Sequence, residues 1–499
     1  MRLTYLAYAF SLAMMYFSIV LLLPIIVALI YGEMQAILPF IIAAASSLMI
    51  GATLRKVVRG TSAIKSINDI KKSEGLCVVT FSWIFAGLFA TIPYLFFGIS
   101  PVNALFEATS GITTTGATIF THYNYPHALF FWRSFSQWLG GMGIIVLFIA
   151  ILPQFAIAGR QLFFAEAPGP TEDKFTPRIK NTASSLWKVY VGMTFLEIIL
   201  LKLNGMSGFN ALCNSLSSVS GGGLSPMGDS MIGCSNIILW IICFFMFFAG
   251  ASYNLQFRAW TKLNPLTLFK NEEFRTYFIV VTILSILLAI SLFIHLNYDF
   301  TSSLTHSFFQ IASVISSTGF CSVDFASWDY TSKALLFLAM MAGSCASSAG
   351  GGVKIIRWLL ILKIMKSELA KVLHPKAVFN IKVGNYSVPK EVLYQTLMFV
   401  SFYLAILFVS ALIIAVIEKS TIIGISGAVS AVGNIGPGLD TIIGPLGNFD
   451  NLQPLSKLIL IIDMYVGRLE LIPFLVLFQK DLWTIKAAQQ LGSSAAQDF

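Results

Sequence analysis

The sequence predicts an all-α polytopic membrane protein, and three observations lead to this fold class. The 499 residues are 57% hydrophobic and only 11% charged, whereas an average soluble chain carries about 25% charged residues. The mean hydropathy of +0.80 leaves no room for a large water-soluble domain. Ten apolar stretches are each long enough to cross a bilayer, which takes about 20 residues. Composition therefore favours one membrane-embedded unit over the roughly three soluble domains that length alone would suggest.

The charges of the connecting loops predict the orientation of these ten spans. The predicted spans are 8–31, 36–54, 77–98, 130–156, 187–203, 235–254, 276–296, 332–364, 391–417 and 455–478. The basic loops fall on one side if the spans alternate, and they are 55–76, 157–188, 255–275 and 354–390. Basic loops mark the cytoplasmic side, so both termini are expected there. The same rule accounts for the net charge of +9 without a nucleic-acid partner.

Catalytic and metal-binding motifs are missing from the sequence. The six cysteines form no CxxC pair and no Cys/His cluster with metal-ligand spacing, so we interpret them as small apolar residues in helices. There is no P-loop and no nucleophile elbow. The first apolar run is longer than the core of a cleavable signal peptide. We therefore expect a protein that is not an enzyme and that binds no cofactor itself.

After the first two spans, a unit of roughly 100 residues occurs four times. Its most regular part is a segment between two apolar runs. The four segments are SGITTTGAT (110–118), SSVSGGGLS (217–225), SVISSTGFC (313–321) and SAVGNIGPG (430–438). When they are aligned on Gly116, Gly223, Gly319 and Gly436, a serine always stands six positions earlier and an Ile or Val four positions earlier. Glycine-rich turns that merely pack helices would not need this common register.

Each segment follows about ten residues of moderate hydrophobicity, and ten residues of helix reach only about 15 Å. Such a half-helix must be re-entrant, because irregular backbone at membrane depth is tolerated only when it is buried or lines a watery cavity. We therefore expect helix, re-entrant pore helix, filter loop and helix (M1-P-M2) in each of four repeats around a central pore, preceded by two extra N-terminal helices. The predicted units are 1–75 for the extension and 76–180, 181–270, 271–385 and 386–499 for the repeats.

The filter loops have the chemistry of a site for a dehydrated monovalent cation. Half-helix C-termini carry partial negative charge, and backbone carbonyls can replace the hydration shell of such an ion. Since the loops contain no carboxylate or histidine, a filter for divalent ions is not expected. The predicted filter residues are Thr114, Thr115 and Gly116, Gly221, Gly222 and Gly223, Ser317, Thr318 and Gly319, and Asn434, Ile435 and Gly436.

The eighth predicted span is interrupted by ten small residues, GSCASSAGGG (343–352), followed by Lys354. Glycines destabilise a helix by about 1 kcal/mol each, so this stretch should unwind and line the cavity below the filter. We expect a movable constriction, and tight helix packing through small residues is the alternative. The predicted gate residues here are Gly343, Ser344, Ser347, Ser348, Gly350, Gly351, Gly352 and Lys354.

Arg468 is the last predicted gate residue and lies near the middle of the tenth span. A charged residue at the bilayer centre costs about 2.5–3.5 kcal/mol on insertion scales and is functional by default. Arg468 is therefore expected to form an electrostatic barrier below the filter, and a structural ion pair with another helix is the alternative. Glu107, nine residues before Gly116, is expected to anchor its half-helix, and the glycines of LGGMG (139–143) to pack helices closely.

With these motifs the sequence resembles the TrkH/KtrB branch of bacterial potassium uptake proteins, which is related to plant HKT transporters and to potassium channels. The segments that carry the resemblance are the filter loops, FWRSFSQWLGGMGIIVL (131–147), AEAPGPTEDKFTPRI (165–179), GSCASSAGGGVKIIR (343–357) and MYVGRLELIPFL (464–475). AEAPGP is typical of TrkH. The resemblance implies a K⁺ transporter of the bacterial inner membrane (with Rb⁺ as a possible substitute ion), a homodimer with one pore per protomer, and a cytoplasmic ring of TrkA-type nucleotide-binding (RCK) regulatory subunits.

Three filter loops match the family pattern and the second departs from it. The family usually has Thr at the position of Gly221 and Phe at that of Leu224, so the run of glycines at 221–223 should make this loop more flexible. In the plant relatives, a serine in the first loop goes with a preference for sodium. This chain has Gly116 in its first loop, and the resemblance therefore implies a preference for potassium.

Two other functions stay open at this point. A symporter coupled to H⁺ or Na⁺ is possible, although no acidic proton relay is evident among the spans. A membrane subunit that assembles or senses without conducting is the other, and the four filter loops argue against it.

Overall fold

The computed structural model describes residues 3–58, 72–155, 175–377, 379–384, 386–470 and 474. The described part is helical, apart from one antiparallel pair of two-residue strands, β1 (Lys382–Val383) and β2 (Tyr386–Ser387). The AEAPGP segment, much of the basic loops 55–76 and 157–188, the end of the tenth predicted span and both termini lie outside these residues.

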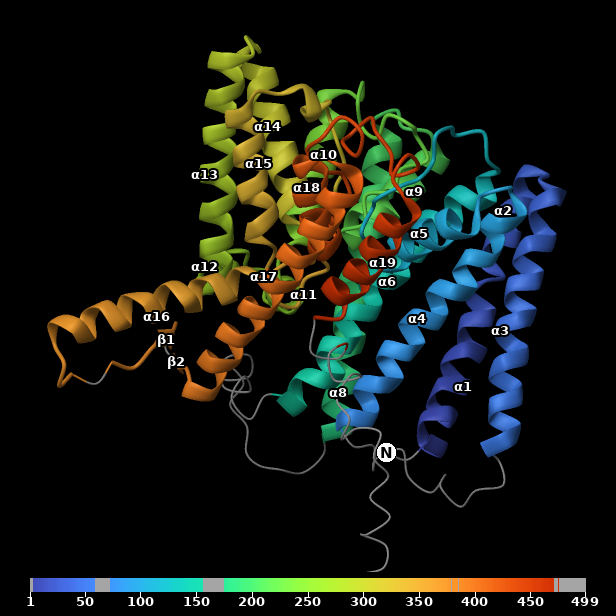
Figure 1. Cartoon of the computed structure of the whole chain (residues 1–499), viewed down its shortest axis with the longest axis horizontal. Helices are drawn as coiled ribbons and strands as arrows, with labels where there is room; N and C mark the ends of the chain where they lie inside the picture. Colours follow the sequence, from blue (N-terminus) through green and yellow to red (C-terminus); the bar gives the residue numbers. More distant parts are fainter. Residues whose placement is uncertain are drawn as a thin grey trace, which may run out of the picture.

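Three N-terminal helices stand at one edge of the molecule (Figure 1). They are α1 (Leu3–Val20), α2 (Leu23–Tyr31) and α3 (Ile37–Val58), with the 3-10 turn η1 (Met34–Ala36) before α3. The helices α1 and α3 pack closely, since a Cβ atom at Gly51 would lie 2.9 Å from Met15 Cγ. The glycine therefore allows the two predicted N-terminal spans to pair.

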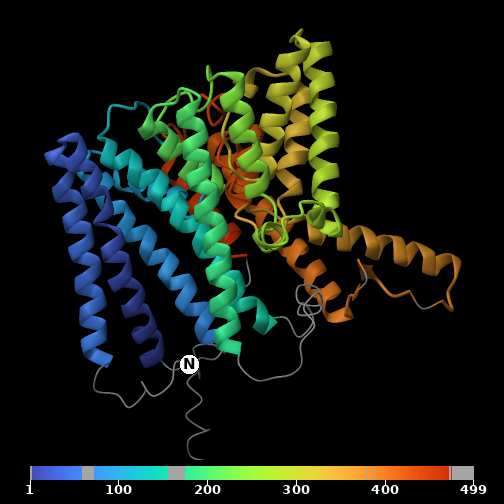
Figure 2. The same cartoon turned by 180° about the vertical axis from the view of Figure 1, so that it is seen from behind.

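Beyond this extension, the order of long helix, short helix, loop and helix occurs four times. The first two groups are α4 (Lys72–Phe96), α5 (Pro101–Ile112) and α6 (His127–Phe155), then α8 (Phe175–Leu203), α9 (Gly208–Ser220) and α10 (Asn236–Ala249). The last two are α13 (Glu272–His295), α14 (Phe300–Ile315) and α15 (Tyr330–Ala342), then α17 (Lys390–Glu418), α18 (Thr421–Gly433) and α19 (Pro454–Arg468). The four short helices lie among the longer ones, as the view from behind also shows (Figure 2).

Local sequence explains where each short helix begins. The residues before them are Ser100, Ser207, Asp299 and Ser420, which are typical N-caps. In the last three, the side chain accepts a hydrogen bond from a backbone N–H of the first turn, and the first has Pro101 at its first position instead. These caps separate each short helix from the long helix before it.

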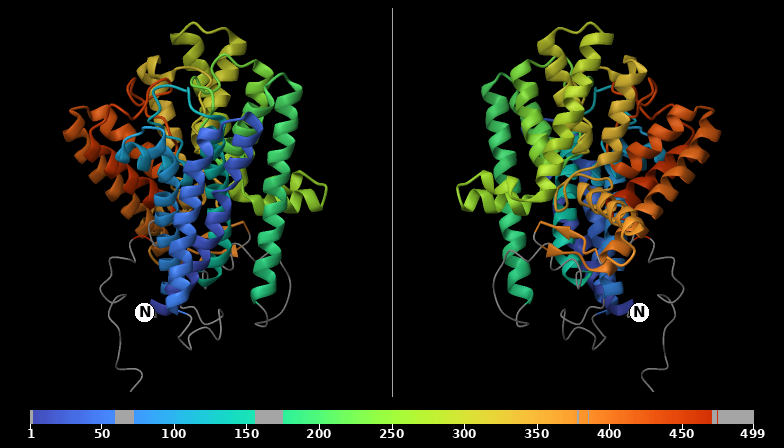
Figure 3. Two further views of the ribbon diagram at one scale, coloured as in Figure 1. Left: turned by 90° about the vertical axis from the view of Figure 1, so that its right-hand side faces the viewer. Right: turned by 90° about the vertical axis from the view of Figure 1, so that its left-hand side faces the viewer.

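Among the described residues, five helices are long and apolar enough to cross a membrane. They are Leu6–Tyr31, Met34–Val58, Gly75–Phe96, Glu272–His295 and Lys390–Glu418, which agree with five predicted spans. The chain is thus a multi-pass membrane protein. The sixth predicted span, 235–254, is too long, because the helix bends by 104° between α10 and α11 (Tyr253–Thr261). α11 and the short α12 (Leu266–Phe269) project to the side (Figure 3).

The eighth predicted span, 332–364, is also corrected. Helix α15 ends at Ala342, twelve residues follow without helix, and α16 (Ile355–Leu373) then runs sideways out of the bundle (Figure 1). Its second half therefore does not continue the direction of α15. The cysteine interpretation holds only in part: Cys77, Cys213 and Cys243 lie in helices, whereas Cys234, Cys321 and Cys345 lie in irregular segments.

Candidate functional site

The four glycine-containing loops meet and form a closed ring. Each aligned glycine faces the loop of the next group so closely that a Cβ atom on it would strike a carbonyl oxygen there. The distances from that Cβ position are 2.2 Å (Gly116 to Gly222 O), 1.8 Å (Gly223 to Thr318 O), 2.0 Å (Gly319 to Ile435 O) and 2.9 Å (Gly436 to Thr115 O). Only glycine fits these four places. The four glycines that align in the sequence therefore occupy equivalent positions in the ring.

The backbone of the four loops has one conformation in common. The aligned glycine and the residue two positions earlier have positive φ in every loop. The values are 54° and 84° (Thr114, Gly116), 67° and 77° (Gly221, Gly223), 57° and 81° (Ser317, Gly319) and 52° and 107° (Asn434, Gly436). Residues other than glycine seldom adopt such angles. The same two positions therefore give all four loops a common and unusual backbone conformation.

The end of each short helix fixes this conformation. In each loop, the N–H of the residue before the aligned glycine donates to the carbonyl of the serine that stands six positions before that glycine, as in a Schellman motif. The N···O distances are 2.9 Å (Thr115 to Ser110), 2.8 Å (Gly222 to Ser217), 2.8 Å (Thr318 to Ser313) and 2.8 Å (Ile435 to Ser430). Since α5, α9, α14 and α18 all end here, their partial negative charge gathers at the ring.

The hydroxyl groups of these serines close three of the loops from behind. Ser217 donates to Leu224 O at 2.6 Å, Ser313 to Phe320 O at 2.7 Å and Ser430 to Gly436 O at 2.6 Å. The hydroxyl of Ser110 has no such partner among the described residues. The serine therefore ties the end of the loop to the short helix in three of the four groups.

A cavity opens on one side of the ring. All four aligned glycines line it, together with Tyr123, Arg133, Met227 and Cys321, among others. Arg133 is the cation of a buried ion pair with Glu107, whose side chains are 1% and 0% exposed, at an N···O distance of 2.8 Å. Glu107 also accepts from Ile119 N at 2.9 Å. The predicted anchoring role of Glu107 thus has a geometric basis, because the carboxylate joins its helix to the first loop.

Two residues of α6 that the sequence analysis missed hold the second loop. Arg133 donates to Ser225 O at 3.3 Å, and Gln137 donates to Gly222 O at 2.6 Å and accepts from Leu224 N at 3.2 Å. The two side chains are four positions apart, so they share one face of the helix. A polar pair with this spacing inside an apolar run is the signal that could have found them.

The interrupted segment 343–354 lies against the other side of the ring. Gly351 N donates to Ser317 Oγ at 2.7 Å, and a Cβ atom at Gly351 would lie 2.3 Å from Gly433 O. Ser347 O accepts from Tyr253 N and Ala349 N donates to Ala249 O, so the segment also bridges the break between α10 and α11. The predicted position next to the filter residues therefore agrees with the observed contacts.

Side chains within the segment hold it in shape. Ser348 donates to Ser344 Oγ at 2.9 Å, and Lys354 donates to Ser344 Oγ and to Gly350 O. Positive φ angles occur at Gly343 (72°), Ser347 (58°), Gly352 (77°) and Lys354 (71°). The carboxylate of Glu273, a residue that the sequence analysis did not single out, accepts from Ala346 N at 2.6 Å. All the predicted gate residues of this stretch thus lie in one compact, non-helical element.

Arg468, at the end of α19, is 2% exposed and joins two elements. Its guanidinium donates to Ala349 O of the interrupted segment at 2.8 Å and to Gly140 O of α6 at 3.1 Å. Both partners are carbonyl groups. Glu470, which follows two positions later, instead pairs with Arg357 of α16 at 2.7 Å. Gly140 itself packs against Ile112, since a Cβ atom on it would lie 1.9 Å from Ile112 O, as expected for the LGGMG glycines.

No group of three or more His, Cys, Asp or Glu side chains in the described ranges could hold a metal ion. At the ring itself, the backbone carbonyl oxygens of Gly222, Thr318, Ile435 and Thr115 lie next to the aligned glycines. Such oxygens suit hard monovalent ions.

Comparison with known proteins identifies the family. Residues 49–485 match the TrkH family, which is described as a cation transport protein. The Trk system potassium uptake protein TrkH of Salmonella typhimurium is 36% identical over 83% of this chain and 87% of its own length. The TrkH of Halomonas elongata is 33% identical over 95% of this chain and 98% of its own length. The crystal structure of the potassium transporter TrkH from Vibrio parahaemolyticus covers 97% of this chain, is 31% identical and superimposes with a TM-score of 0.86. From the ring of loops and these relatives together it follows that the chain belongs to the TrkH family of cation transport proteins and is not an enzyme.

Proposed function

We propose that this protein takes up K⁺ across the bacterial inner membrane through a pore at the centre of the four helix groups. The observation that carries the proposal is the closed ring of four loops with one shared backbone conformation. In each group the long helix, re-entrant helix, loop and second helix serve as one pore repeat. The carbonyl groups of the predicted filter residues replace the hydration shell of the ion, and K⁺ is the transported ion, for which Rb⁺ can substitute.

The segment 343–354 and Arg468 serve as the gate. The segment lies directly beneath the ring, where it contacts the third and fourth loops. Arg468 places a buried positive charge beside it, which opposes a cation that leaves the filter. Flux then requires that the segment and the guanidinium move out of the ion path. The two alternatives, packing of small residues and a structural ion pair, predict no such movement.

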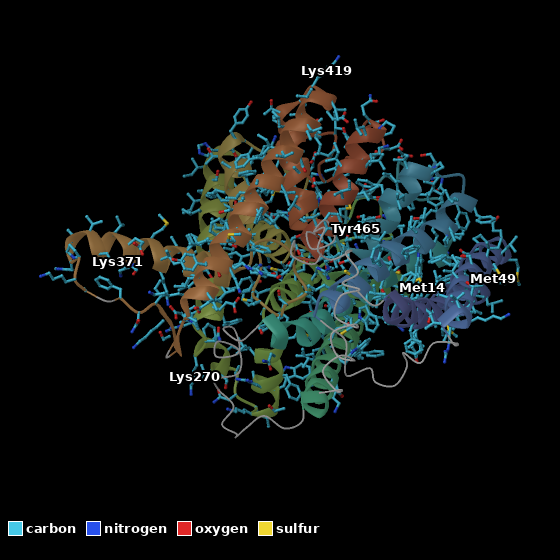
Figure 4. All side chains as sticks on the ribbon, turned by 60° about the horizontal axis from the view of Figure 1, so that its bottom comes forward. Met14, Met49, Lys270, Lys371, Lys419 and Tyr465 are labelled. Carbon is cyan, nitrogen blue, oxygen red and sulfur yellow. The ribbon has the colours of Figure 1, made fainter. Side chains whose placement is uncertain are left out.

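The relatives support a proposal about the partners of this chain. Proteins named as Trk system potassium uptake proteins are similar to this chain over most of its length. We infer a homodimer with a pore in each protomer and a TrkA-type ring of nucleotide-binding subunits on the cytoplasmic side. The projecting helix α16 carries exposed lysines such as Lys371 and is suited to the contact with such a ring (Figure 4).

A symporter coupled to H⁺ or Na⁺ is the second candidate, because two carboxyl groups are buried in predicted spans. Asp463 accepts from Ser410 Oγ at 2.8 Å and Glu197 from Ser218 Oγ at 2.5 Å. In each, the second carboxyl oxygen has no hydrogen-bond partner among the residues that the structure describes. The closed ring of four loops gives the channel-like function the stronger support.

Uptake of ⁸⁶Rb⁺ into liposomes that contain only this chain tests the function. With the membrane potential held at about −100 mV, a unit charge gains about 2.3 kcal/mol on entry, which corresponds to roughly 50-fold accumulation. We expect this uptake without any Na⁺ or H⁺ gradient, with competition by K⁺ and not by Na⁺. A symporter would instead be established if uptake occurred only after a Na⁺ or H⁺ gradient was imposed and if Asp463→Asn or Glu197→Gln abolished this uptake.

A further inference from the structure

The second filter loop lacks a side chain that the other three loops have. The residue before the aligned glycine is Thr115, Thr318 or Ile435 in those loops and Gly222 in the second. The three side chains are buried behind the ring. Thr115 Oγ1 accepts from Asn434 Nδ2 at 2.9 Å, and Thr318 Oγ1 lies 2.7 Å from Ser316 Oγ. The two threonine side chains therefore help to hold their loops, and a glycine at 222 cannot do so.

The side chain of Gln137 occupies the space that a side chain at residue 222 would fill. A Cβ atom built on Gly222 would lie 2.4 Å from Gln137 Cδ and 2.6 Å from Gln137 Oε1. Gln137 belongs to α6 of the first group, 85 positions away in the chain, and is fully buried. The missing volume is thus filled from a different helix.

The amide of Gln137 also makes the polar contacts that fix the loop. Its Nε2 donates to Gly222 O at 2.6 Å, and its Oε1 accepts from Leu224 N at 3.2 Å. One turn earlier on the same face, Arg133 donates to Ser225 O. The loop is therefore held at residues 222, 224 and 225 by α6. This is the loop whose three consecutive glycines have the greatest backbone freedom.

We propose that Gln137 is a positioning residue that supplies, from the neighbouring repeat, the side chain that the second filter loop lacks, and that it thereby sets the preference for K⁺ over Na⁺. The inference rests on the proposed function of the ring. A loop that is free to shrink around a smaller ion loses its preference for the larger one, so a fixed second loop is needed for selectivity. The role is specific to this loop, because the other three carry their own side chain.

A double-mutant cycle in the full-length protein tests this complementarity. Gln137→Ala removes the side chain that fills the space beside Gly222. We then expect Na⁺ to compete with ⁸⁶Rb⁺ uptake about tenfold better than in the wild type, because the loss of about one buried hydrogen bond corresponds to a change of that size. Gly222→Thr alone should impair uptake, since the new side chain strikes Gln137. The double variant Gln137→Ala/Gly222→Thr should regain most of the wild-type selectivity, because residue 222 then carries the side chain that the first and third loops have.

The controls separate positioning from general damage. Trp138→Phe removes a partly buried hydrogen bond from the adjacent residue to Thr194 Oγ1 and should leave selectivity unchanged. Gln137→Glu keeps the shape, places a carboxyl oxygen opposite Gly222 O, and should lose selectivity even if Gln137→Ala does not fold. The thermal unfolding temperatures of the single and double variants in detergent measure the coupling between residues 137 and 222 independently of ion uptake.

The outcomes distinguish the two proposals. If wild-type protein takes up no ⁸⁶Rb⁺, the proposed function fails and the selectivity role fails with it, whatever the unfolding temperatures show. If the wild type is selective but Gln137→Ala and Gln137→Glu are equally selective, only the inference about Gln137 is overturned. Additive losses in the double variant, in selectivity and in unfolding temperature alike, would also overturn it, because a side chain at 222 would then not replace Gln137.

Discussion

A single side chain, Arg468, connects the segment beneath the ring to helix α6. Its two carbonyl partners belong to the interrupted segment and to α6, and the glycine at one of those contacts packs against the end of the first short helix. A hydrogen bond from a charged group is worth about 1.5–3 kcal/mol. The position of the segment therefore depends on Arg468 to an extent that a single substitution can reveal.

We expect Arg468→Gln and Arg468→Ala to increase ⁸⁶Rb⁺ flux into liposomes by about tenfold or more, since each 1.4 kcal/mol changes an equilibrium tenfold. The substitution removes both the positive charge from the ion path and the link that holds the segment. The yield of folded protein after size-exclusion chromatography is measured in parallel. Loss of folded protein without any gain in flux would mean that Arg468 is only structural.

The serines six positions before the aligned glycines offer a matched set of variants. We expect Ser313→Ala and Ser217→Ala to weaken K⁺ selectivity, because the hydroxyl no longer holds the carbonyl after the loop. Ser110→Ala is the control, since this hydroxyl makes no such bond. Competition of Na⁺ with ⁸⁶Rb⁺ uptake measures the effect, and equal losses in all three variants would show that the bond does not matter.

Among the elements, the interrupted segment is the one whose backbone differs most from the regular fold. It is almost wholly buried, yet it contains no helix between Ala342 and Ile355. Non-helical backbone at this depth requires internal partners, and the bonds to Glu273, Ser317 and Ala249 supply them. An element held by a few polar contacts is more easily displaced than a continuous helix, which suits a gate.

We expect Gly351→Ala to reduce uptake strongly, because the new methyl group would lie 2.3 Å from Gly433 O and force the segment and the fourth loop out of their contact. Replacing Gly350 as well should enhance the effect, since its Cβ would lie 2.6 Å from Ser316 O. Gly208→Ala is the control, because nothing lies within 4 Å of the added atom. Single-channel recording in bilayers separates a change in open probability from one in conductance. Unchanged open probability in the double variant would argue against a movable gate.

Elements whose cause is local in the chain could be predicted from the sequence. The four loops were found because serine, Ile or Val, and glycine recur at fixed spacing, and each loop conformation depends on the helix end just before it. The bend after Ala249 and the direction of α16 could not be predicted, because they depend on contacts such as Cys345 N to Gly250 O. Gln137 was missed for the same reason, since its partner lies 85 positions away.

For the whole molecule, the distribution of charge predicts the orientation in the membrane. Lys270 and Lys371 lie on the side from which α16 projects, whereas Lys419 lies at the far end, where α17 meets α18 (Figure 4). At the opposite edge of the molecule, Met14 of α1 is buried and Met49 of α3 is exposed (Figure 4). By the positive-inside rule, we expect the side with α16 and its lysines to face the cytoplasm and the cavity above the ring to face outward.

Cysteine labelling in intact cells tests this orientation. The background variant is Cys234→Ser, because the other five cysteines are buried and Cys234 is only half-buried. In this background we expect a membrane-impermeant maleimide to label Lys419→Cys in whole cells, and to label Lys371→Cys and Lys270→Cys only after the cells are opened, since all three positions are exposed. The unmodified background protein shows whether the remaining thiols react. Labelling of Lys371→Cys in intact cells would show that the orientation is the opposite one. The cavity above the ring would then open to the cytoplasm, whereas uptake requires that ions enter from outside.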